Sequence, residues 1–238
     1  MARTPRRVLV PRRMRRIVVS CALGVVALAC VGVLVGLVLS RATPRWWRSV
    51  PRDEPATITL AEQVENGLVN RAYRNRDEPW TVEITAEQAN AWLAVRLPKW
   101  AANQGQSWPG EVSEVQVAFA PGRIVLGARV RASGRWHVVS ADVSPRIEER
   151  GLYLDARGVS VGRLGASASW AARVASPLIP ERAVAPGLMR AALGEEPIAR
   201  EAAVKLEDGR RLRVMHIEPG EGWLRVTFQT EPIAASGP

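Results

Sequence analysis

The residues with the clearest potential for catalysis lie in the segment Gly158-Val159-Ser160-Val161-Gly162. It matches the Gly-x-Ser-x-Gly pattern of serine hydrolases, and Asp208 and His216 follow in the Ser, Asp, His order. In those enzymes the serine stands on a sharp turn from a strand into a helix. Here two β-branched valines flank Ser160 and no helical pattern follows it, which favours an extended strand. A serine hydrolase therefore stays an alternative to a function without catalysis.

Other reactive residues are few. The histidines are His137 and His216, and neither has a partner at the spacing that metal ligands use. Cys21 and Cys30 are nine positions apart in an apolar run, a separation of about 13 Å in a helix, which is too far for a disulfide. The adjacent pairs of acidic residues would point to opposite faces of a strand. The sequence predicts no catalytic residue, no metal site and no cofactor.

The positive charge of the chain is confined to its N-terminal part. The formal net charge is +10, but residues 1–52 contain eleven arginines and no acidic residue. The remaining residues, 53–238, carry 22 basic and 23 acidic side chains and are nearly neutral. A nucleic-acid-binding protein carries its basic patch on the folded domain, so the sequence predicts no nucleic-acid partner.

Residues 17–39 form an uncharged apolar run that predicts a single transmembrane helix. As a helix the run would measure about 34 Å, against a hydrocarbon core of roughly 30 Å. Seven arginines precede the run and four follow it, which predicts a cytoplasmic N-terminus and an extracytoplasmic C-terminal domain at the bacterial inner (plasma) membrane. The run is longer than the apolar region of a cleavable signal peptide, the competing interpretation.

Two pairs of residues have further expected roles near this span. Trp46 and Trp47 follow it closely and are expected to lie at the membrane interface. Gly32 and Gly36 form a Gly-x-x-x-Gly pattern, which would allow a homodimer through the transmembrane helix.

The chain divides into five predicted regions: a basic cytoplasmic tail (1–16), the span (17–39), a juxtamembrane linker (40–56), an extracytoplasmic domain (57–230) and a disordered tail (231–238). Within the domain, helices are expected over residues 60–74 and from the capping box at Thr85 to Pro98. A capping box at Thr59 and Glu62 should start the helix expected over residues 60–74. Residues 98–110, with Trp100 and Trp108, are expected to form a loop, and residues 167–194 two short helices.

A short strand is expected at residues 80–84. Apolar and polar residues then alternate with period 2 in two regions, from Glu111 to Val161 and from Val204 to Phe228. Pro121-Gly122, Pro145, Asp208-Gly209 and Pro219-Gly220 are the expected turns. The result is an α+β fold in which a curved antiparallel sheet, made of two meanders, packs with short helices. The residues predicted to line an apolar ligand-binding face are Val117, Phe119, Leu126, Val130, Leu152, Leu154, Leu212, Val214, Leu224 and Val226.

The order of these segments resembles a known group. The series ITAEQANAWLAVRLPKW, VQVAFAPGRIVLGARVR, GRWHVVSADVSPRIEERGLYLDARGVSVGRLG and LEDGRRLRVMHIEPGEGWLRVTF is similar to YpmS-like and LmeA-like proteins of the tubular lipid-binding group. The resemblance covers roughly residues 80–230. It implies a long curved sheet wrapped against helices and an apolar groove for acyl chains, and it transfers no catalytic residues.

Together these observations predict a membrane-anchored, non-enzymatic envelope protein that binds or handles a lipid or another apolar ligand. Its expected partners are membrane lipid and an envelope protein. The alternative is a structural or scaffold domain whose apolar faces form an ordinary closed core.

Overall fold

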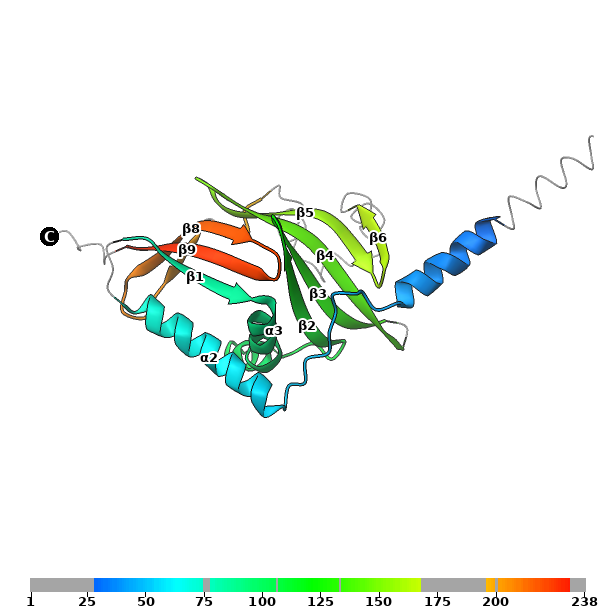
Figure 1. The fold of residues 1–238 in the computed structure, drawn as a ribbon, viewed down its shortest axis with the longest axis horizontal. Coiled ribbons are helices and arrows are strands. Elements are labelled where there is room, and N and C mark those ends of the chain that lie inside the picture. Colours follow the sequence, from blue (N-terminus) through cyan, green and yellow to red (C-terminus); the bar gives the residue numbers. More distant parts are fainter. Residues whose placement is uncertain are drawn as a thin grey trace, which may run out of the picture.

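Two antiparallel sheets and four helices form the part of the chain that the structure describes, so the protein has an α+β fold (Figure 1). The structure is a computed structural model that describes residues 28–74, 78–105, 107–132, 134–167, 196–199 and 201–231. A first helix covers residues 28–41. The other elements are α2 (Pro55–Ala72), β1 (Trp80–Thr85), α3 (Ala86–Val95), α4 (Leu97–Asn103), β2 (Val112–Ala120), β3 (Arg123–Ala132), β4 (Arg135–Glu148), β5 (Gly151–Val161), β6 (Leu164–Ser167), β7 (Ala203–Lys205), β8 (Arg211–Pro219) and β9 (Trp223–Glu231).

Several predicted features fall outside the described residues. They are the basic tail (1–16), the first part of the predicted span (17–27), nearly all of the two helices expected within residues 167–194, and the tail beyond residue 231. Within the described ranges, no helix has both the length and the apolar composition that a membrane crossing needs.

The five-stranded sheet is a meander in the order β2-β3-β4-β5-β6, which confirms the period-2 prediction for this region. The Pro121-Gly122 turn is also confirmed, because Gly122 joins β2 to β3 with a φ of +70°. The turn expected near Pro145 is wrong, because β4 continues to Glu148 and pairs Pro145 with Leu154. Pairing between β4 and β3 ends at Val143, so the missing N–H of Pro145 interrupts no ladder on that side.

The four-stranded sheet has the order β1-β9-β8-β7, and its last three strands are the second predicted meander. The Asp208-Gly209 turn is confirmed, with Gly209 at a φ of +89°. The fourth strand comes from far away in the sequence, since β1 pairs with β9 along its whole length. Nothing in the local sequence predicts that pairing.

Two helix boundaries differ from the prediction because of prolines. Helix α2 begins at Pro55, after Glu54 as the N-cap, so Thr59 lies inside the helix and its capping box does not start it. Pro98 lies in the first turn of α4, where a missing N–H costs no hydrogen bond, so the expected loop is partly helical and Trp100 lies on it. The capping box at Thr85 is confirmed, because Thr85 and Gln88 each accept from the other's backbone N–H.

Six of the buried hydrophobic residues form two small clusters. Ala61 of α2 packs with Ala91 and Val95 of α3. Trp80, Val82 and Leu212 of the four-stranded sheet form the other cluster, and Leu68 and Ala72 of α2 pack against it. The four-stranded sheet therefore has its apolar face covered by α2.

A side-chain amide joins α3 to the edge of the five-stranded sheet. Asn90 donates to the carbonyl oxygen of Val117 (2.9 Å) and accepts from the N–H of the same residue (2.7 Å). Asn90 thus satisfies the backbone of β2 in the way that a neighbouring strand would. At the end of β2, the N–H of Gly222 donates to the carbonyl oxygen of Phe119, which links the two sheets.

We expect Asn90→Ala to lower the free energy of unfolding by roughly 1–3 kcal/mol, because both backbone groups of Val117 lose their partner. The measurement is denaturant unfolding of the detergent-solubilised full chain. Asn103→Ala is the matched control, since Asn103 is exposed at the end of α4. Equal stability of the two variants would contradict the role given to Asn90.

Candidate functional site: the apolar face of the five-stranded sheet

The register of the five-stranded sheet places its apolar residues on one face. A bulge in β5 keeps the alternation in phase, because Asp142 pairs with Gly158 and Val143 with Ala156. We call this side the apolar face. Its members are Val115, Val117, Phe119, Ile124, Leu126, Ala128, Val130, Val139, Ala141, Val143, Pro145, Ile147, Leu152, Leu154, Ala156, Val159, Val161, Leu164 and Ala166.

Most of the apolar face is only partly covered. Of its members only Val117, Phe119 and Val143 are buried, while Leu126 is 37% exposed and Leu164 is 44% exposed. The rest are half-buried, and neither buried cluster of the described residues contains any of them. Soluble monomers rarely leave a broad apolar surface open, so this face is the strongest candidate for binding an apolar partner.

The opposite face is mixed, because it carries polar residues as well as Val125, Val138 and Tyr153, and the linker lies on it. Ser140 and Ser160 share a hydrogen bond of 2.8 Å on this face. A Cβ at Gly127 would lie 2.5 Å from the ring of Trp46 and 3.0 Å from that of Trp47, so only glycine allows this contact. The predicted interface residues Trp46 and Trp47 are therefore half-buried against the sheet. Their place at a membrane interface stays a prediction.

A side chain of the sheet also forms hydrogen bonds with the backbone of the linker. The side-chain amide of Gln116 donates to the carbonyl oxygen of Arg48 and accepts from its N–H. Gln116 is itself buried. The segment after the first helix is thus docked onto the domain.

The end of the first helix is held by the turn between β5 and β6. The N–H of Arg163 donates to the carbonyl oxygen of Leu39 (2.8 Å), and its Nε donates to that of Thr43 (2.9 Å). Gly162 lies so close that a Cβ there would be 2.5 Å from the carbonyl oxygens of Leu39 and Ser40. A cation at the C-terminal end of a helix also offsets the helix dipole.

A pocket of about 620 Å³ runs along the edge strand β2, between the linker, α2 and α3. Val117 and Phe119 line it together with Leu60. Arg48 and Glu87 are among its charged residues. The pocket therefore offers both apolar and charged groups next to the apolar face.

The structure divides the ten predicted face residues between the two sheets. Val117, Phe119, Leu126, Val130, Leu152 and Leu154 lie on the apolar face. The others share the face of the four-stranded sheet that α2 covers, and they are Leu212, Val214, Leu224 and Val226. Gly32 and Gly36 lie on the first helix, with nothing within 4 Å of a Cβ at either position.

The serine-hydrolase residues are not brought together. Ser160 lies in β5 and its hydroxyl shares a hydrogen bond with that of Ser140, while His216 lies in β8 of the other sheet. Asp208 bonds Arg210, and this hydrogen bond lowers the pKa of Asp208. Within the described ranges, no three His, Cys, Asp or Glu side chains lie where they could share a metal ion.

The chain matches no family model, and none of the curated proteins matches it.

We expect Leu126→Ala to lower the free energy of unfolding by less than about 1.5 kcal/mol, because its side chain is incompletely packed. Leu212→Ala removes the same atoms from a site that is 6% exposed and should cost about 2–5 kcal/mol. Denaturant unfolding of the full chain in detergent compares the two. A loss at Leu126 as large as that at Leu212 would show that the apolar face is a closed core.

Proposed function

We propose that this protein is a membrane-anchored, non-enzymatic protein of the bacterial envelope that binds the acyl chains of a lipid on its apolar face. The observation that carries the proposal is the partial exposure of most of that face. Acyl chains are long and apolar, so they suit an extended open sheet surface better than they suit a small enclosed pocket.

The exposure of the first helix supports the anchor. Its apolar residues at positions 28, 31, 33, 34, 35, 37 and 38 are between 47% and 74% exposed. These positions lie on every side of a helix with 3.6 residues per turn. A helix that is apolar all round is typical of a membrane environment, and it continues the uncharged run that begins at residue 17.

The arrangement of the domain supports a lipid ligand supplied by the membrane. The first helix projects from one end of the two sheets, next to the turn between β5 and β6 (Figure 1). Leu164, one of the two most exposed members of the apolar face, belongs to the strand that follows this turn. An acyl chain leaving the bilayer would therefore reach the apolar face near β6.

The anchor can be tested by its orientation. We expect a reporter that is active only after export to be active when fused to Pro238, because the seven N-terminal arginines keep the N-terminus in the cytoplasm. The matched fusion carries the same reporter at the N-terminus and should be inactive. Activity of a cytoplasm-only reporter at Pro238 would contradict the proposed topology.

The ligand can be tested by photo-crosslinking in vesicles. We expect a benzophenone amino acid at Leu126 to form adducts with lipid acyl chains in the reconstituted full chain. Val125 is the matched control, because it is the preceding residue and lies on the opposite face. Adducts only with protein at Leu126 would favour a scaffold function, and equal lipid adducts at both positions would contradict a specific lipid-binding face.

A further inference from the structure

A second pocket lies where the first helix meets the five-stranded sheet. Its volume is about 300 Å³, and its lining includes Arg41, Arg129 and Trp136. These residues come from the end of the first helix, from β3 and from β4 respectively. The pocket exists only because the helix end is docked on the domain through Gly162 and Arg163.

The arginines of this pocket are suited to bind an anion. Arg129 is held in place by an ion pair with Glu114 (3.1 Å) and by the ring of Trp136, which lies 5.7 Å from its guanidinium carbon. Among the described residues of the lining, Glu114 is the one carboxylate, and Arg129 uses one of its five N–H groups on it. The guanidinium group of Arg41 has no hydrogen-bond or ion-pair partner among the described residues. Arg41, Arg129 and Glu114 together carry a formal net charge of +1, which matches one phosphodiester group.

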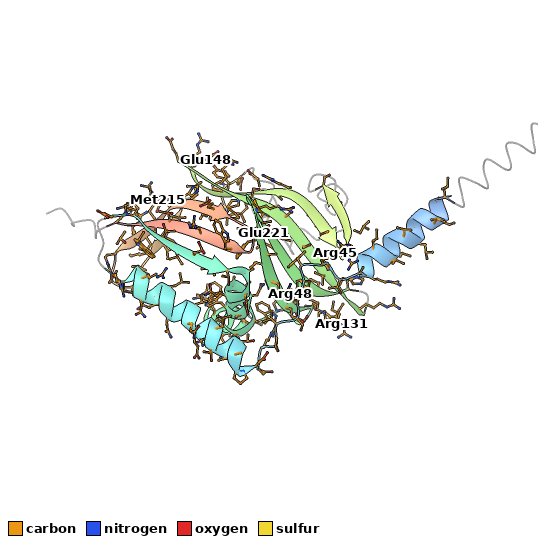
Figure 2. All side chains as sticks on the ribbon, viewed as in Figure 1. Arg45, Arg48, Arg131, Glu148, Met215 and Glu221 are labelled. Carbon is orange, nitrogen blue, oxygen red and sulfur yellow. The ribbon has the colours of Figure 1, made fainter. Side chains whose placement is uncertain are left out.

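The surroundings of the pocket add further positive charge. Arg45, Arg131 and Arg135 are exposed and, like Arg41, have no acidic partner in the described part of the chain. Figure 2 shows Arg45 and Arg131 at the end of the sheets that carries the first helix, with Glu148 and Met215 at the far end. By contrast, arginines of the four-stranded sheet are paired with carboxylates, such as Arg225 with Glu83 and Glu218.

The position of Arg41 along the chain places the pocket at the level of the lipid headgroups. The predicted span ends at Leu39, and two further helical residues advance about 3 Å along the axis. The headgroup layer is roughly 5 to 8 Å thick on each side of the bilayer. Tryptophans also concentrate at this depth, and Trp47 and Trp136 both line the pocket.

We propose that this pocket binds the phosphate of an anionic phospholipid from the leaflet that the domain faces, with Arg41 and Arg129 as the ligands of the phosphate. The inference rests on the membrane anchor of the proposed function. It goes beyond the apolar face, because it concerns the headgroup and a different surface of the sheet.

The test is native mass spectrometry of the full chain in a neutral detergent with equimolar phosphatidylglycerol and phosphatidylcholine. We expect the wild type to retain more phosphatidylglycerol. Arg41→Gln and Arg129→Gln should each lower that preference about fivefold, the effect of one guanidinium at a membrane surface. Because the guanidinium group of Arg41 has no partner among the described residues, Arg41→Gln should leave the fold intact. Arg129→Lys keeps the charge and controls for loss of the ion pair.

Arg150→Gln is the matched control, because Arg150 is exposed and lies two residues after Glu148, which Figure 2 shows at the end of the sheets away from the first helix. An unchanged lipid preference in this variant supports a local site. Equal retention of the two lipids by the wild type, or an equal loss in Arg41→Gln and Arg150→Gln, would overturn the proposal. Displacement of phosphatidylglycerol by excess inorganic phosphate would identify a site for free phosphate and would also overturn it. None of these results changes the reporter topology or the adducts at Leu126, so failure here is distinguishable from failure of the proposed function.

Discussion

The contact of Trp46 and Trp47 with the backbone of Gly127 determines how the rest of the molecule is arranged. Since no side chain fits between β3 and these rings, the linker lies flat on the face of the five-stranded sheet opposite the apolar face. Gln116 binds the backbone of Arg48, which follows the two tryptophans in the linker. Arg163 binds the carbonyl oxygen of Leu39, at the end of the first helix. Because the linker occupies one face of the sheet, α2 and α3 follow at the β2 edge, and the linker leaves the apolar face uncovered.

This docking also relates the two proposed lipid contacts. A flexible linker would let the domain rotate freely above a membrane, and no pocket could form between Arg41 and Arg129. With the linker docked, the phosphate pocket and the apolar face belong to the same sheet, on opposite sides of it. One lipid molecule could not occupy both proposed sites unless its chains passed around an edge of the sheet, so the two proposals describe separate binding events.

The predictions from sequence succeeded where the determinant is local. The period-2 alternation, the Gly122 and Gly209 turns and the Thr85 capping box each depend on a few neighbouring residues, and the structure has all of them. The predicted start of α2 is wrong because Pro55 at its first position outweighs a capping box four residues later. The sequence motifs Gly-x-x-x-Gly and Gly-x-Ser-x-Gly involve other glycines. Gly127, which contacts the rings of Trp46 and Trp47, belongs to no motif, so the sequence does not predict its role.

The candidate site could be predicted only in part, for a related reason. Alternation shows which residues share a face of one strand, but it does not show which faces pack together. Leu126 and Leu212 are both predicted to lie on the apolar side of a strand, yet α2 covers only the second. The pairing of β1 with β9 decides this, because it brings Trp80 and Val82 beneath α2, and that pairing joins residues about 145 positions apart. The bidentate bonds of Asn90 and Gln116 are equally long-range, and an isolated amide in the sequence gives no sign of them.

The stability of the fold and its proposed function are connected through the same partly exposed apolar face. The α2–α3 cluster consists of Ala61, Ala91 and Val95, whose short side chains bury little apolar area. Larger buried side chains lie in both sheets, such as Trp80 and Leu212 in one and Phe119 and Tyr153 in the other, while most of the apolar face of the five-stranded sheet is only half-buried. A ligand that binds only the folded state stabilises it in proportion to the logarithm of its concentration over its Kd. If the proposed anchor holds the domain beside a bilayer, lipid is permanently available to the partly exposed apolar face and would stabilise the folded state by binding there.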